Sequence, residues 1–175
     1  TSVPTPTYLG GNFTVVASAD SGGTITYEYV SGPCALVNSS TGEFSSTGSG
    51  VCVVKALAAA NGNYAAGFKE QSVNISVATP TITFTSVPSP KYLGGNFTVT
   101  ATANSGGTIT YSYVSGPCAL VNGSTGEFSS SGSGTCVVQA DAAANGSYGA
   151  GSKQQSISIS VADPTITFTS VPTPT

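Results

Sequence analysis

The sequence predicts an all-β protein built from tandem β-sandwiches, and three observations support this class. The chain repeats with a period of 84 residues, and 66 of the 84 pairs between residues 1–84 and 85–168 are identical without a gap. Within each copy, apolar and polar residues alternate, as in strands with one buried face. Clusters of Gly, Ser, Pro and Asn separate these stretches, as turns do. Short strands at this spacing are typical of a β-sandwich.

Five strands with clear alternation are expected in each copy, together with up to two weaker ones. In the first copy the clear strands are at residues 13–19, 24–30, 52–56, 73–77 and 81–84. The weaker strands are at residues 35–38 and 42–46. The side chains expected to face the core are those of Phe13, Val15, Ala17, Ala19, Ile25, Tyr27, Tyr29, Cys52, Val54, Ala56, Val73, Ile75, Val77, Ile82 and Phe84.

The copies are expected to be independent domains, because 84 residues is too long for a solenoid repeat of about 20 to 45 residues. We predict a first repeat at residues 1–79 that lacks its first strand, a second at 80–163, and the start of a third at 164–175. The connections are short and contain proline, which limits bending. The sequence therefore predicts an extended, semi-rigid array.

The composition excludes several classes of function. Only 6% of the residues are charged, the chain has four Lys and Arg together, and it has no His. So few cations cannot neutralise a nucleic acid backbone or an anionic membrane surface. The apolar runs are shorter than the roughly 20 residues that a spanning helix needs. Neither nucleic acid nor membrane insertion is therefore expected.

The sequence also lacks the residues of a catalytic or metal site. Without His there is no usual base for a Ser or Cys nucleophile. The three carboxylates of the second copy, Glu127, Asp141 and Asp163, are spread along the chain instead of forming a pair. No catalytic residue, cofactor or metal ligand is expected, and the chain is predicted not to be an enzyme.

The four cysteines are expected to form two disulfides. Each copy has two Cys and no CxxC motif, which argues against a metal or redox site. Pairing within a copy is favoured, because equivalent positions of consecutive sandwiches lie too far apart for a bond. We therefore predict Cys34–Cys52 and Cys118–Cys136, in a chain that folds in an oxidising compartment.

Several motifs resemble the immunoglobulin-like repeats found in tandem in large secreted and cell-surface proteins of bacteria. These are the opening TITF, the strand YLGGNFTVTATA, the segment with YVSGP, and the ANG turn before the last strand, and they cover both copies. The resemblance implies an immunoglobulin-like sandwich displayed outside the cell as a spacer, stalk or adhesin arm. It transfers no catalytic residue. The absence of Trp and the positions of the Cys differ from antibody domains.

Other paired positions have alternative readings. Glu43 and Glu127 are either cation ligands or, more simply, carboxylates that accept backbone hydrogen bonds in a turn. Lys69 and Lys153 could form an isopeptide bond with an Asn. The tyrosines near loops could stack on a sugar or simply pack their rings; they are Tyr8, Tyr64, Tyr92 and Tyr148.

The leading hypothesis is an extracellular structural spacer, whose partners are the neighbouring repeats of its own chain. The rival hypothesis is a filament subunit. In it, residues 164–175 of one molecule complete the first domain of an identical subunit, as donor strands do in pili. The residues of this possible donor strand are Thr165, Ile166, Thr167 and Phe168. An adhesin arm that binds a glycan or protein through its loops is the third hypothesis.

Overall fold

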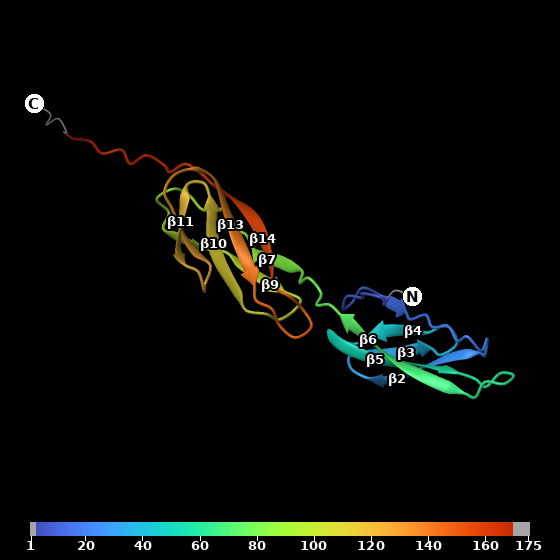
Figure 1. The fold of residues 1–175 in the computed structure, drawn as a ribbon. Helices are drawn as coiled ribbons and strands as arrows, with labels where there is room; N and C mark the ends of the chain where they lie inside the picture. The colour runs from blue at the N-terminus through green and yellow to red at the C-terminus, as the bar shows by residue number, and fades with distance from the viewer. Residues whose placement is uncertain (1–2, 170–175) are drawn as a thin grey trace, which may run out of the picture. The chain divides into compact units, whose positions relative to one another are not determined.

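The computed structural model describes residues 3–169, and within that range it contains strands and no helix (Figure 1). Accordingly, no helix among residues 3–169 is long and apolar enough to cross a membrane. The described residues form two compact units. The first contains the chain up to Thr81 together with residues 103–107 and 142–151, and the second contains residues 82–102, 108–141 and those from Ser152 onward.

The first copy forms two antiparallel three-stranded sheets. One has the order β1-β4-β3, and the other has the order β2-β5-β6, whose strands lie side by side in Figure 1. The strands are β1 (Asn12–Thr14), β2 (Ile25–Ser31), β3 (Cys34–Asn38), β4 (Glu43–Ser46), β5 (Gly50–Ala58) and β6 (Gly67–Ile75).

The core of the first copy consists of the alternate residues that these strands turn inward. Phe13 of β1 and Phe44 of β4 stack with ring centroids 5.9 Å apart, and Phe44 is fully buried. Val54 of β5 and Val73 of β6 are buried as well, and they belong to the same apolar cluster. Both sheets therefore contribute one face to a single core, as a β-sandwich requires.

The second copy repeats this arrangement and adds a pair of strands. Its sheets have the orders β8-β12-β11 and β10-β13-β14, and β7 pairs with β9. The strands are β7 (Ile82–Ser86), β8 (Asn96–Thr98), β9 (Thr100–Ala103), β10 (Ile109–Ser115), β11 (Cys118–Asn122), β12 (Glu127–Ser130), β13 (Gly134–Ala142) and β14 (Gly151–Ile159). The predicted fold class, all-β with tandem immunoglobulin-like sandwiches and one disulfide in each, is confirmed.

Two strand predictions were wrong in their bounds. The strand expected at 13–19 ends at Thr14, although the matching residues of the second copy continue into β9. The difference has a physical cause, because β9 has β7 as its hydrogen-bonding partner. The strand expected at 73–77 begins earlier, at Gly67, because β6 pairs with β5 along its whole length. Its first six residues are all exposed, and those from Lys69 to Ser72 are polar, so the sequence shows no alternation there.

Two residues expected in the core are on the surface. Tyr29 is 45% exposed and Val77 is 49% exposed. The Tyr29 hydroxyl instead donates a hydrogen bond to the carbonyl of Gly32, 3.0 Å away. Val77 follows the end of β6 at Ile75, where the sandwich no longer covers it.

The predicted start of a third repeat, residues 164–175, is described only as far as Thr169, and residues 170–175 lie outside the described residues. Residues 164–168 pair with no strand in the described part of the chain, and they follow the second copy as an extended trace (Figure 1). A strand exists only beside a hydrogen-bonded neighbour, which this segment lacks there.

Candidate functional site

Each copy has one disulfide that joins its two sheets. Cys34 lies on β3 and Cys52 on β5, with 5.8 Å between their Cα atoms. Cys118 on β11 and Cys136 on β13 have the same separation. Disulfides need Cα atoms about 4.4 to 6.8 Å apart. All four residues are buried, so each bond is a crosslink through the core between facing sheets.

The turn before the first cysteine of each pair requires glycine. Gly32 has a φ of 96°, and a Cβ placed on it would lie 2.1 Å from the carbonyl oxygen of Val51. Gly116 has a φ of 98° and the same close approach to Thr135. No other residue type tolerates both conditions. This contact between the turn and the start of β5 or β13 explains why the glycine of the Ser-Gly-Pro-Cys motif occurs in both copies.

A buried tyrosine holds the segment that follows β1. The hydroxyl of Tyr27 accepts a hydrogen bond from the backbone N–H of Ala17, 2.8 Å away. The Tyr27 ring lies against Gly42, where a Cβ would lie 3.0 Å from the ring carbons. Tyr111 and Ala101 make the same bond in the second copy, at 2.7 Å. Residues 15–18 therefore have a fixed position although they belong to no strand.

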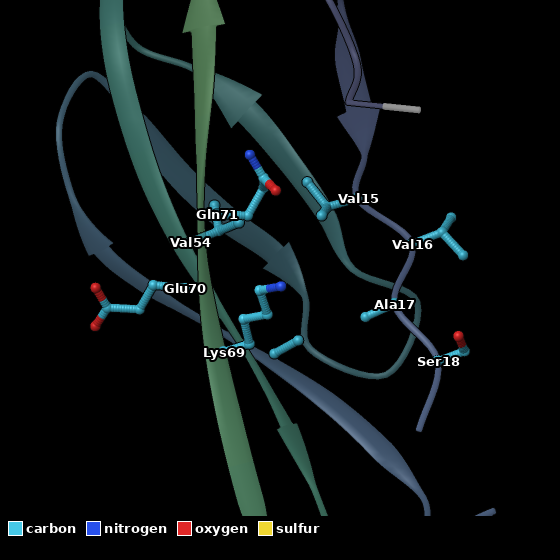
Figure 2. A pocket seen from close by; sticks show the side chains of 9 residues that line it. Val15, Val16, Ala17, Ser18, Val54, Lys69, Glu70 and Gln71 are labelled. Atoms are coloured by element: carbon cyan, nitrogen blue, oxygen red, sulfur yellow. The ribbon is translucent and has the colours of Figure 1, made fainter. Parts of the chain in front are cut away.

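Between this segment and β6 the first copy has an open groove, with apolar side chains of β5 at its floor and polar side chains of β6 at its rim. Its wider part is a hollow of about 220 Å³ with Val54 and Ala56 of β5 among its lining residues. Figure 2 shows the segment Val15–Ser18 on one side and Lys69, Glu70 and Gln71 on the other, with Lys69 turned toward the segment and Glu70 away from it.

The groove continues as a smaller hollow of about 140 Å³ toward the start of β6. The two hollows share Ala17, Ser18, Ala56 and Lys69, so they form one channel along the segment. The smaller hollow also reaches Ala58 at the end of β5. Analysis of the sequence did not predict this groove, because its lining residues come from four separate parts of the chain.

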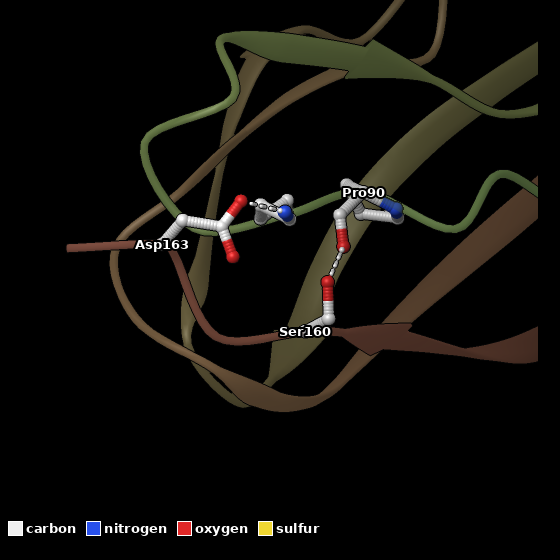
Figure 3. Close-up of polar contacts among 4 residues, drawn as sticks. Pro90, Ser160 and Asp163 are labelled. Carbon is white, nitrogen blue, oxygen red and sulfur yellow. Dashed lines mark hydrogen bonds and ion pairs between the residues drawn. The ribbon is translucent and has the colours of Figure 1, made fainter. Parts of the chain in front are cut away.

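The possible donor strand is exposed over its whole length. Ile166 is 83% exposed and Phe168 is 86% exposed, although both are large and apolar. Just before it, Asp163 pairs with the Lys91 ammonium group at 2.6 Å, and the Ser160 hydroxyl donates to the Pro90 carbonyl oxygen at 3.4 Å (Figure 3). These contacts attach the chain near Asp163 to the second copy and leave residues 164–168 unpacked.

The glutamates expected to accept hydrogen bonds from turn amides instead accept a hydrogen bond from an asparagine side chain. The Glu43 carboxylate accepts a hydrogen bond from the Asn12 side chain, 2.9 Å away across β1 and β4. The turn amides are bonded by Asn38, whose Oδ1 accepts from the N–H groups of Ser40 and Thr41. Glu127 and Asn122 have these roles in the second copy. Within residues 3–169 no group of three or more Cys, Asp or Glu side chains could hold a metal ion.

Lys69 and Lys153, the candidates for an isopeptide bond, are both exposed. Their surroundings therefore do not provide the burial that activates such a lysine.

The tyrosines near the loops differ in exposure. Tyr64 is 54% exposed, whereas Tyr8 and Tyr92 are half-buried. Within the first compact unit, Tyr8 packs edge-on against Tyr148, with ring centroids 5.7 Å apart. Of the four, Tyr64 is thus the one with a mostly accessible ring.

A turn at the start of each copy displays a leucine in an unfavourable conformation. Leu9 has a φ of 63° and is 62% exposed, and Leu93 has a φ of 62° and is 76% exposed. Gly10 donates to the Thr7 carbonyl at 2.8 Å, which makes Leu9 the third residue of a four-residue turn. That position of a type II turn favours glycine. Because the side chain is mostly exposed, packing does not explain why leucine occurs at this position.

No protein-family model matches the chain, and no curated protein matches it. Among solved structures, the EC1-2 fragment of human protocadherin-24 is 17% identical over 93% of this chain and 91% of its own, with a TM-score of 0.38. The EC1-3 fragment of Drosophila N-cadherin is 15% identical over 91% of this chain and 62% of its own, with a TM-score of 0.33. Immunoglobulin domains 1-5 of Sidekick-1 are 13% identical over 79% of this chain and 32% of that one, with a TM-score of 0.35. Because these TM-scores are below 0.5, we base no conclusion on the likenesses.

Proposed function

We propose that the chain is an extracellular structural module, a tandem spacer or stalk of a bacterial cell-surface or secreted protein. Its repeats would be residues 1–79, 80–163 and, in part, 164–175, and its partners would be the neighbouring repeats. The observation that supports this proposal most is the disulfide between the facing sheets of each copy. Such a bond suits a domain that holds its shape outside the cell.

The rest of each copy supports the same role. The buried side chains of the described residues are apolar or disulfide-bonded, with no polar or charged side chain among them. The residues that the two copies share include the cysteines, the turn glycines and the tyrosine that holds residues 15–18. These residues maintain a fold and bring together no nucleophile and base. We therefore propose no enzymatic activity.

Single-molecule force spectroscopy tests the spacer function. In the oxidised chain, the segment between Cys34 and Cys52 spans 18 residues and should stay closed when its copy unfolds under load. Reduction should release about 60 Å more per copy, at roughly 3.4 Å per extended residue. The double variant Cys34→Ala, Cys52→Ala is the control, because one copy should then lengthen fully without a reductant. Equal extension of the oxidised and reduced chains would refute a force-bearing disulfide.

An adhesin arm is a second candidate, and the turn leucines favour it. Leu9 and Leu93 expose apolar side chains while their positive φ values cost conformational energy. Strained residues of this kind are common at sites that bind a partner. A screen of the immobilised chain against glycans and extracellular proteins tests this candidate. A ligand that binds the native chain and loses affinity for the variant Leu9→Gly, Leu93→Gly would support it. Equal binding to both chains would exclude these turns.

A further inference from the structure

The groove of the first copy corresponds to a place that the second copy fills with a strand. Adding the repeat period to the lining residues Val15–Ser18 gives residues 99–102, which include most of β9. In the second copy β9 pairs with β7. The side chain of Ile82, at the start of β7, is 4% exposed. The same scaffold therefore has a docked strand in one copy and a channel in the other.

The burial of the groove floor changes accordingly. Ala140 and Ala142 of β13 are 0% and 2% exposed in the second copy. Their counterparts Ala56 and Ala58 in the first copy are half-buried and line the groove. These alanines occupy matching positions of β5 and β13 but differ in what covers them, and the docked β7 strand accounts for the difference.

A glycine at the start of the last strand gives a second, independent sign. A Cβ on Gly151 would lie 2.8 Å from the Cγ of Pro80, the residue that leads into β7. Around the matching Gly67, nothing lies within 4 Å of such a Cβ. The space that Pro80 fills beside Gly151 is thus open beside Gly67.

The hydrogen bonds of β7 define the register. The Asn104 N–H donates to the Thr81 carbonyl at 3.1 Å, and the Thr81 N–H donates to the Asn104 side-chain oxygen at 2.8 Å. Four residues further along, the Thr85 and Thr100 hydroxyls lie 2.9 Å apart. Residue numbers rise along one strand as they fall along the other, so the pair is antiparallel. In the first copy Asp20 replaces Asn104, and a carboxylate oxygen can accept the same bond.

The chain contains a second copy of the strand that fits this groove. Residues 164–168 read Pro-Thr-Ile-Thr-Phe, as residues 80–84 do. We propose that residues 164–168 of one molecule dock as an antiparallel strand in the groove of the first copy of a second, identical molecule, with Ile166 over the alanine floor. This inference goes beyond the spacer function, because it gives residues 164–168 a partner in a second molecule, whereas the spacer function assigns them to the start of a third repeat.

The energetics favour this docking. Ile166 and Phe168 are exposed in the free chain, so docking removes two large apolar side chains from water. The backbone of residues 165–168 gains main-chain hydrogen bonds from residues 16–20, which pair with no strand in the described part of the chain. Because the donor strand and the groove lie on different parts of the same molecule, the contact is heterologous and joins molecules head to tail.

Crosslinking in the expected register provides the first test. In an antiparallel pair, the residue numbers of opposite positions have a constant sum. Because Thr81 pairs with Asn104 in the second copy, Thr83 lies opposite Thr102, and both are exposed. The matching positions in the proposed contact are Thr167 and Ser18. A chain with Thr167→Cys is mixed with a chain that carries Ser18→Cys and Ile166→Asn, so that the second acts only as acceptor.

A covalent heterodimer should form at least about tenfold faster with the Ser18→Cys acceptor than with a control acceptor that carries Thr14→Cys and Ile166→Asn. That control thiol lies four residues out of register, about 13 Å away at the rise of a strand. Mass spectrometry of the linked peptides identifies the bond. Equal crosslinking with both acceptors, or none with either, would overturn the proposal.

Light scattering against concentration provides the second test, with matched variants at adjacent positions. Ile166 and Thr167 are both exposed in the free chain, so neither substitution threatens the fold. In the docked strand Ile166 matches the buried Ile82, and Thr167 matches the exposed Thr83. The native chain and Thr167→Asn should exceed the monomer mass of 17.2 kDa as concentration rises. Ile166→Asn should stay monomeric, and association of this variant like the native chain would refute the contact.

A synthetic Pro-Thr-Ile-Thr-Phe peptide, titrated into the Ile166→Asn chain, separates the groove from its occupant. Saturable binding that Ala56→Lys weakens at least tenfold supports the groove. If the peptide binds but the native chain remains monomeric in light scattering, the groove is real and the strand of a second molecule is not its occupant. The absence of peptide binding would refute the groove itself.

Discussion

The strand β7 allows a direct test of burial, because its Ile occurs again in an unpacked copy of the same motif. Ile82 is 4% exposed, and Ile166 is 83% exposed. The substitution Ile82→Ala removes three buried carbon atoms, at about 0.8 kcal/mol each in transfer free energy. A cavity term adds to this, so we expect a loss of about 3 kcal/mol in the free energy of unfolding of the second copy.

The same substitution at Ile166 should change the free energy of unfolding by less than about 0.5 kcal/mol, because that side chain already faces water. For a domain of this size, a loss of about 3 kcal/mol lowers Tm by roughly 12 to 24 °C. Calorimetry at a concentration low enough to keep the chain monomeric measures both variants. Similar Tm values for the two variants would refute the packing of β7 on the second sandwich.

Three further predictions concern the first copy and the turns. Cys34→Ala with Cys52→Ala should lower the stability of the first copy by about 3 kcal/mol in urea unfolding, since the closed loop no longer restricts the unfolded chain. Leu93→Gly should raise stability by about 0.5 to 1 kcal/mol, because glycine accepts the positive φ and little packing is lost. Replacing Glu28 by Ser and Lys55 by Gln, singly and together, should give a coupling energy of only about 0.3 to 1 kcal/mol, because the pair is at the surface.

Each of these predictions has a result that contradicts it. For the disulfide, an unchanged urea midpoint of the first copy would do so, with the transition of the second copy as the internal reference. For Leu93, a loss of stability on substitution by glycine would show that the side chain packs. For the ion pair, a coupling energy above about 2 kcal/mol would show that water does not screen it.

Much of the strand pattern could be predicted from the sequence, because alternation and turn residues are local signals. Phe13, Val54 and Val73 are buried where the period of two puts apolar residues inward. The prediction failed for the first half of β6, where Lys69 and Gln71 are exposed and only pairing with β5 makes the segment a strand. Local patterns do not contain that pairing.

The groove could not be predicted, because it depends on what lies next to residues 15–18. The sequences at 13–19 and 97–103 are nearly the same, yet only the second continues as a strand. Whether a segment becomes a strand depends on a partner that is distant in sequence. The sequence showed that residues 164–168 repeat β7, but the open channel that matches them appeared only in the folded chain.

The sequence by itself determined the repeat, the all-β class and the Ser-Gly-Pro-Cys turns, since each depends on residues close together along the chain. The tertiary structure alone decided that each disulfide crosses between facing sheets and that the same scaffold is covered by β7 in one copy and open in the other. The physical reason is that burial and strand pairing are properties of neighbours in space, and identical residues acquire different roles when those neighbours differ.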